Sequence, residues 1–210
     1  MKLVEGTLCA ALSLKYPRLR MKVFILDDGN RVEIKDMVIR VQRQAVTLNV
    51  CDNIEYIART KSANVPHNAK AGNINNALLC EGLRGEFLVV YDSDMVCKPD
   101  FLLKTLGHFL KMKKLDSTAK YEFFSLKSRT AFVQVPQDFY NVPWFDPFGH
   151  AARFFYGPMM QGRDGMSATP CVGTGVIFQR QALLSIGGQS YGSVTEDYLT
   201  CMQLQHAGNN

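Results

Sequence analysis

Short apolar runs alternate along the chain with stretches in which apolar residues recur every three or four positions. Continuous runs of this length are typical of strands buried on both faces, and the three-to-four spacing is typical of helices with one buried face. We expect strands at residues 22–26, 54–58, 86–91, 130–135 and 172–178. We expect helices at residues 4–16, 35–47, 70–79, 99–110, 180–185 and 195–208, with loops and short helices between 138 and 170.

This alternation predicts one α/β domain, residues 1–210, with a doubly wound and mostly parallel sheet. A chain of 210 residues suits one such domain with a sizeable core. In sheets of this kind, ligands bind beyond the carboxyl ends of the strands. Those strand ends are therefore the first place to look for chemistry.

Composition and charge narrow the functional classes. The formal net charge of +5 permits an anionic partner without requiring one. The basic stretch at 111–114 has no interleaved aromatic residues, so we expect a solvated helix end and no nucleic-acid interface. The six cysteines lack zinc-ligand spacing, and no run of about 18 apolar residues predicts a membrane span.

Two of the predicted strands end in paired acidic residues. Asp92 and Asp94 follow the strand at 86–91, and Asp27 and Asp28 follow the strand at 22–26. Mg²⁺ and Mn²⁺ are commonly held between carboxylates and substrate phosphates. A turn or a helix cap explains either pair alone, but two pairs at one edge of a sheet suggest a nucleotide-diphosphate site.

A third acidic cluster lies at the predicted start of the last helix. Thr195 is a suitable N-cap, which places Glu196 and Asp197 in the first turn. Carboxylates there either complement the helix dipole or supply a general base that takes a proton from an acceptor hydroxyl. The residues alone leave both interpretations open.

The order of these segments resembles the motif set of processive family 2 glycosyltransferases, and it is most similar to that of cellulose synthases. Asp-Asp-Gly, Lys-Ala-Gly-Asn-Ile-Asn-Asn-Ala, Asp-x-Asp and Thr-Glu-Asp follow one another in family order, and further segments at 133–140, 168–175 and 186–188 extend the resemblance over nearly the whole chain. Each motif is weak by itself. The resemblance implies a Rossmann-like GT-A fold that is incomplete at both ends, without the first strand and the Gln-x-x-Arg-Trp region.

The resemblance also implies roles for single residues. Asp197 resembles the catalytic base, with Glu196 beside it as a positioning residue. The nucleotide-sugar site it implies consists of Asp27, Asp28, Lys70, Asp92 and Asp94, with Mg²⁺ or Mn²⁺ at Asp92 and Asp94.

The acceptor side of the implied site rests on the segment at 170–174, which occupies the place of the family's acceptor motif. Its candidate residues are Cys171, Gly173 and Thr174. Trp144 is a candidate for stacking on a sugar ring, and core packing is the alternative for it and for the neighbouring aromatic residues.

The activity implied by the resemblance is inverting transfer of glucose from UDP-glucose to the non-reducing end of a β-1,4-glucan chain. The implied partners are UDP-glucose and the glucan acceptor. The parent protein would be embedded in the plasma membrane with this part on the cytosolic face, and assembly into a synthase complex is left open. In the family, the first strand helps to hold the nucleotide and the Gln-x-x-Arg-Trp region borders the acceptor channel. Because both are expected to be missing, we expect the isolated chain to be inactive.

Three alternatives remain open at this point. Chitin, hyaluronan and mixed-linkage glucan synthases share the same acidic set. Residues 89–96 also resemble the nucleophile motif of haloacid-dehalogenase-type phosphatases, with Asp92 as nucleophile and Asp94 as acid, although the further acidic pair lies upstream here and not downstream. The third alternative is a domain that only binds a sugar nucleotide or another protein of a complex.

Overall fold

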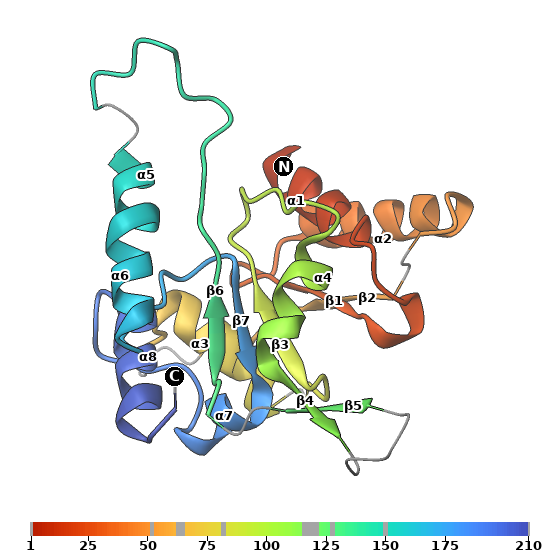
Figure 1. Ribbon diagram of the computed structural model, residues 1–210. Coiled ribbons are helices and arrows are strands. Elements are labelled where there is room, and N and C mark those ends of the chain that lie inside the picture. Colours follow the sequence, from red (N-terminus) through yellow and green to blue (C-terminus); the bar gives the residue numbers. More distant parts are fainter. Residues whose placement is uncertain are drawn as a thin grey trace.

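The first part of the chain forms a parallel pair of strands covered by two helices (Figure 1). Strands β1 (Val23–Leu26) and β2 (Ile54–Ile57) pair in parallel, and helices α1 (Lys2–Leu12) and α2 (Val32–Thr47) pack against them through one apolar cluster. The connection through α2 is the kind of crossover that a parallel pair requires. The structure is a computed structural model, and it describes residues 2–50, 53–61, 66–80, 83–114, 122–126, 129–148 and 151–209.

The larger core forms around a three-stranded sheet in the order β3 (Phe87–Val90), β7 (Val176–Gln179) and β6 (Phe132–Gln134). The central strand β7 is antiparallel to both neighbours. Ile177 and Phe178 are fully buried although they face opposite sides of the sheet, which explains the continuous apolar run. The predicted α/β fold is confirmed, but its parallel part is β1 with β2, so among the described strand pairs the arrangement is mixed and not mostly parallel.

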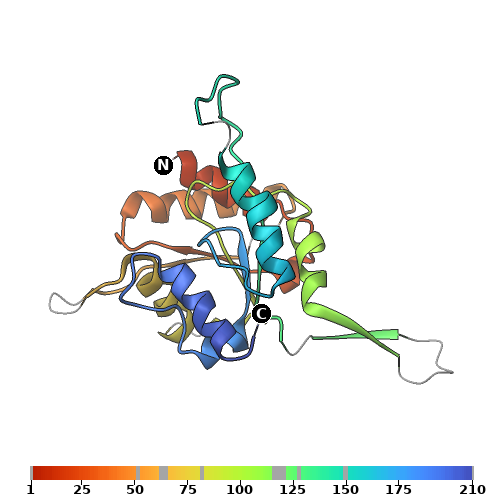
Figure 2. The same ribbon diagram turned by 60° about the vertical axis from the view of Figure 1, so that its left-hand side comes forward.

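Helices cover both faces of this sheet (Figures 1 and 2). Helix α4 (Phe101–Thr105) packs with Ile177 on one face, whereas α7 (Arg180–Ser185) and α8 (Glu196–His206) pack with Phe178 on the other. The remaining elements are the 3-10 turns Arg18–Arg20 and Leu106–Phe109, α3 (Ala69–Asn75) with the π-helical turn Asn76–Cys80, β4 (Leu110–Lys114), β5 (Glu122–Leu126), α5 (Ala151–Phe154), the π-helical turn Phe155–Met159 and α6 (Met160–Gly165).

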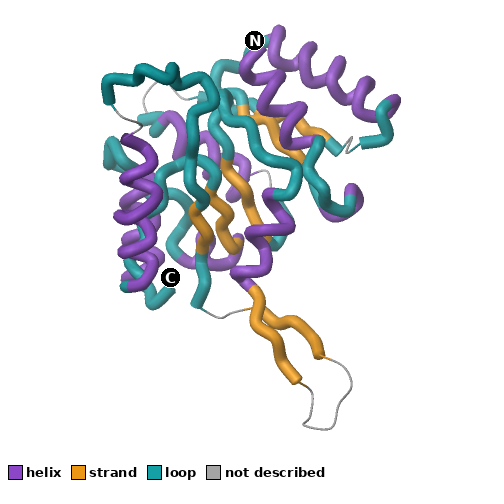
Figure 3. Tube along the Cα trace, turned by 45° about the horizontal axis from the view of Figure 1, so that its top comes forward, coloured by secondary structure: helices purple, strands orange, loops and turns teal. Residues whose placement is uncertain are grey.

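Residues 110–114 form a strand and not the expected helix end. Strand β4 pairs with β5 in an antiparallel hairpin that projects from the body of the protein (Figure 3). The apolar residues Leu106, Phe109 and Leu110 continue the helical spacing, but Leu110 and Met112 also alternate with lysines, which is the pattern of a strand. Within the described residues, no helix is long and apolar enough to cross a bilayer.

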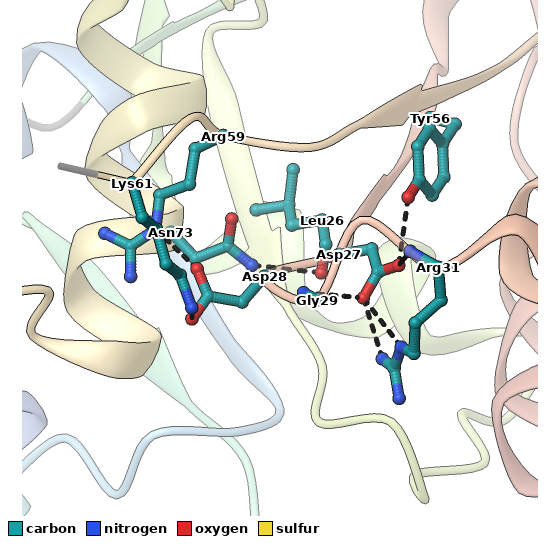
Figure 4. A network of polar contacts seen from close by, with 9 residues as sticks. All are labelled: Leu26, Asp27, Asp28, Gly29, Arg31, Tyr56, Arg59, Lys61 and Asn73. Atoms are coloured by element: carbon teal, nitrogen blue, oxygen red, sulfur yellow. Dashed lines mark hydrogen bonds and ion pairs between the residues drawn. The ribbon is translucent and has the colours of Figure 1, made fainter. Parts of the chain in front are cut away.

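The buried carboxylate of Asp27 fixes the turn after β1 (Figure 4). It accepts hydrogen bonds from the backbone N–H groups of Gly29 (3.1 Å) and Arg31 (2.7 Å). The Arg31 guanidinium donates two more, at 2.7 and 3.1 Å, and the Tyr56 hydroxyl donates one at 2.9 Å. Burial raises the pKa of Asp27, but the hydrogen bonds from Arg31, Gly29 and Tyr56 outweigh it and lower the pKa to about 2.

Asn75, at the end of α3, fastens the segment that leads into α8. Its amide group donates to the Gln189 carbonyl and accepts from the Gln189 N–H, both at 2.7 Å. The preceding Gly188 has a φ of +99°, and a Cβ atom there would lie 2.4 Å from Asn75 Oδ1. Only glycine fits this close approach, so the Asn75 side chain ties the end of α3 to the backbone of the segment that precedes α8.

Acid unfolding is expected to reveal the contribution of Asp27. Folding lowers its pKa from the ordinary value of about 4 to about 2. The stability it provides is therefore complete above about pH 4 and is lost as the pH falls toward 2. From this group alone, the free energy of unfolding should fall by about 2 kcal/mol over that window.

The measurement is urea unfolding of the wild type and of Asp27→Asn between pH 2 and pH 7. The variant should be less stable at pH 7 and should change less with acid. Asp36→Asn, which alters an exposed carboxylate on α2, is the control and should follow the wild type. The same pH dependence in Asp27→Asn and the wild type would contradict the assignment.

Substitution of Gly188 is expected to cost more stability than substitution of its neighbour. Gly187 also has a positive φ, +85°, but nothing lies within 4 Å of its Cβ position. Gly187→Ala should therefore show only backbone strain, of order 1 kcal/mol. Gly188→Ala adds the clash with Asn75 and should lose at least about twice as much. Equal losses of stability in the two variants, measured by thermal unfolding, would show that the contact with Asn75 does not contribute to stability.

Candidate active site

The ammonium group of Lys70, in the first turn of α3, joins two segments that are distant in sequence. It lies 2.5 Å from Asp92 Oδ1, just after β3, and 2.6 Å from the Gly173 carbonyl oxygen, just before β7. Both interactions are charge-assisted, which makes them the stronger kind of hydrogen bond. Lys70 therefore balances the Asp92 carboxylate and ties the end of β3 to the turn that precedes β7.

The glycine turn before β7 brings the last helix to the same place. Gly173 has a φ of +81°, and a Cβ atom there would lie 2.8 Å from Asp197 Oδ2 and 3.1 Å from Lys70 Nζ. No larger residue fits between the carboxylate and the ammonium group without displacing one of them. The predicted residues Lys70, Asp92, Gly173 and Asp197 thus meet around one backbone turn.

Side chains on neighbouring elements hold this turn in place. The buried Thr174 hydroxyl accepts a hydrogen bond from the Asp92 N–H at 3.0 Å. Gln134 of β6 accepts from the Val172 N–H at 3.0 Å and donates to the Thr174 carbonyl at 2.9 Å. The predicted strand at 172–178 therefore begins only at Val176, because the preceding residues form the turn. Gln134 lies in the segment 133–140, which is part of the family resemblance but for which the sequence predicts no role.

Asp197 stands at the start of α8, beside two groups that are partly or fully buried. Its Oδ1 accepts a hydrogen bond from the Tyr198 N–H at 2.7 Å. Burial, followed by the charge of Asp197, raises the pKa of Tyr156 to about 12. Burial also raises the pKa of the Cys171 thiol to about 12, with Asp197 as a smaller cause. Both groups therefore stay protonated at neutral pH.

The carboxylates of Asp27 and Asp28 point to opposite sides of their turn (Figure 4). Asp27 is 2% exposed and its carboxylate is taken up by the turn contacts described above. Asp28 is paired with Arg59, and with Lys61 at 2.5 Å, and its side chain is 31% exposed. Its pKa is lowered, first by the hydrogen bond from Arg59. Of the two residues, Asp28 is therefore the one whose carboxylate stays partly open to solvent.

Asp94 is exposed, and its carboxylate has no hydrogen bond or ion pair among the described residues. The described residues also contain no group of three or more His, Cys, Asp or Glu side chains arranged to hold a metal ion. Mg²⁺ and Mn²⁺ bound through one or two carboxylates and substrate phosphates do not need such a group. The donor set of Asp92 and Asp94 therefore fits a divalent cation that is bound together with a diphosphate.

The remaining predicted residues take less direct positions. Glu196 is half-buried in the first turn of α8, and its carbonyl accepts from the Thr200 hydroxyl at 2.6 Å. Thr195 occupies the N-cap position without a capping hydrogen bond. The side chains of Cys171 and Thr174 are buried, so this turn offers a ligand mainly its backbone. Trp144 is 91% exposed and contacts Phe145, with ring centroids 5.5 Å apart.

Comparisons with known proteins identify the family of this chain. A family model described as "Glycosyltransferase like family 2" matches residues 2–210. The chain is 46% identical over 156 residues to a UDP-forming cellulose synthase catalytic subunit of Dictyostelium discoideum. The matched region covers 73% of this chain and 13% of that protein. It is 30% identical over 217 residues to the UDP-forming cellulose synthase catalytic subunit of Pseudomonas fluorescens (strain SBW25), which covers 100% of this chain and 25% of that protein.

A solved structure supports the fold. The mannosyltransferase PcManGT from Pyrobaculum calidifontis, in complex with GDP-Man and Mn²⁺, matches with a TM-score of 0.62 and 18% identity, over 100% of this chain and 50% of that one. The predicted GT-A fold is thereby confirmed. The chain spans a quarter or less of the length of the two cellulose synthases. Because the family model matches nearly all of the sequence, this chain belongs to glycosyltransferase family 2.

Proposed function

We propose that this chain is the donor-binding and catalytic part of an inverting cellulose synthase, which transfers glucose from UDP-glucose to the non-reducing end of a β-1,4-glucan. The observation that carries the proposal is the convergence of Lys70, Asp92 and Asp197 on the Gly173 turn. A cation, an acidic pair and a separate carboxylate within one small region are the groups that transfer from a nucleotide sugar needs. The names of the relatives support glucose and UDP as the donor parts.

On the donor side, the chain supplies both charge and anchoring. Asp28 faces the nucleoside end, and Lys70, beside Asp92, offsets the negative charge of the diphosphate. Asp94, with Asp92 beside it, holds the divalent cation. When bound, Mg²⁺ or Mn²⁺ neutralises negative charge that develops on the departing diphosphate. Mn²⁺ in the complex of the mannosyltransferase supports a divalent cation in this fold, and the oxygen ligands of the two aspartates suit either ion.

On the acceptor side, Asp197 acts as the general base. Its carboxylate removes the proton from the acceptor hydroxyl as that oxygen attacks the anomeric carbon. The attack comes from the face opposite the diphosphate, so one displacement converts an α-linked donor into a β-linked product. Tyr156 and Cys171 keep their protons and do not compete for this role. Glu196 and the backbone of 171–174 line the acceptor side, while Trp144 remains a candidate for glucan stacking.

Among the alternatives, other processive synthases of the family fit the same acidic set and differ in the donor sugar. The phosphatase interpretation loses its support because the family model that matches the chain is that of glycosyltransferases. A parent protein at the cytosolic face of the plasma membrane, in which this domain adjoins membrane-spanning segments, follows from the same proposal.

The donor site can be tested by calorimetric binding of UDP in the presence and absence of Mn²⁺. We expect binding that requires the cation and that weakens at least about tenfold in Asp94→Ala, because a charged ligand is lost. Asp197→Asn should change the affinity by less than about threefold, since its carboxylate serves the acceptor side. Asp100→Ala, which removes only a surface ion pair with Lys104, is the control. Unchanged binding in Asp94→Ala would refute the assignment of the cation site.

The donor sugar can be tested by competition against bound UDP with Mn²⁺ present. UDP-glucose should compete at least about tenfold better than UDP-N-acetylglucosamine or GDP-mannose, because a site shaped for one sugar rejects a bulkier substituent or a different base. Preference for UDP-N-acetylglucosamine would favour a chitin or hyaluronan synthase. Preference for GDP-mannose would exclude all of the UDP-dependent synthases.

A further inference from the structure

The guanidinium of Arg59 lies between the turn after β1 and the start of α3 (Figure 4). Arg59 follows β2, and its Nε donates to Asp28 Oδ1. Its NH2 group donates to the Ala69 carbonyl at 3.3 Å, in the first turn of α3. The Arg59 side chain is only 10% exposed. One planar group thus contacts both the residue that faces the nucleoside and the helix that carries Lys70.

The helix leaves room for this side chain at Gly72. A Cβ atom there would lie 2.2 Å from the NH1 atom of Arg59 and 2.1 Å from the His67 carbonyl oxygen. Asn73, the next residue of the helix, donates to the Leu26 carbonyl at 3.0 Å and so docks the helix on the end of β1. The absence of a side chain at Gly72 is therefore what lets the guanidinium reach α3.

We infer that Arg59 is a positioning residue that holds Asp28 and Lys70 at a fixed separation, so that one donor molecule can contact both. The inference rests on the proposed function, and it adds a residue that the sequence motifs do not single out. With a side chain that is only 10% exposed, Arg59 offers the donor little surface of its own. It acts by setting the start of α3, and hence Lys70, relative to the Asp28 carboxylate.

Lys61 provides a natural comparison. Both cations pair with Asp28, but only Arg59 also contacts α3 among the interactions of the described residues. Arginine has several donors in a rigid plane, whereas lysine is a single point charge. Removal of Lys61 therefore takes away charge near Asp28, while removal of Arg59 takes away charge and the link to Lys70.

The test is a double-mutant cycle on the affinity for UDP with Mn²⁺, measured by calorimetry on the full chain. Arg59→Gln should weaken binding about tenfold in the wild type but less than about threefold in a Lys70→Gln background. The effect is smaller there because the ammonium group that Arg59 positions has already been removed. Lys61→Gln should weaken binding by the same factor, about threefold, in both backgrounds. Arg59→Lys keeps the charge but should lose nearly as much affinity as Arg59→Gln. If Arg59→Gln does not fold, Arg59→Lys takes its place in the double-mutant cycle.

The outcomes separate the inference from the proposed function. If the wild type does not bind UDP with Mn²⁺, the proposed function fails. If it binds but Arg59→Gln costs the same factor in both backgrounds, the positioning role is overturned and the proposed function stands. Full recovery of affinity in Arg59→Lys would likewise overturn it, since charge alone would then explain Arg59. Coupling between Arg59 and Lys70, without coupling between Lys61 and Lys70, supports it.

Discussion

The balance between carboxylates and cations around α3 is the constraint on which the rest of the site depends. Acidic residues gathered in one region repel one another unless each has a cation or a proton close by. The fold supplies a cation to Asp27, Asp28 and Asp92 in turn, while Asp94 has no partner among the described residues. Of these four aspartates, Asp94 is therefore the one whose charge the described residues leave without a cation.

Close backbone approaches make this arrangement possible. A side chain at Gly72 would displace Arg59, one at Gly173 would separate Lys70 from Asp197, and one at Gly188 would strike Asn75. In each case the absence of a side chain lets two segments of the chain approach closely. The same turns that give the backbone its path therefore set the distances between the charged groups.

Local patterns in the sequence were sufficient for much of the fold. Continuous apolar runs located β1 and β3. A glycine is common just after a helix, and Gly208, which follows α8, adopts a φ of +86°. The apolar pattern failed at residues 110–114, where helical spacing and strand alternation coincide. It also gave no direction for β7, because a buried strand looks the same in a parallel and in an antiparallel sheet.

The sequence by itself determined the order of the elements, the acidic residues and the family, because all of these depend on residue types and local spacing. Only the tertiary structure decided which cation serves which carboxylate. Arg59 meets Asp28 across 31 positions, and Lys70 meets Asp92 across 22 and Gly173 across 103. Such pairings depend on where strands end in space and on how far a side chain reaches. For that reason Asp27 and Asp28, neighbours with the same side chain, face opposite ways: Asp27 is buried in its turn, while Asp28 stays partly exposed between Arg59 and Lys61.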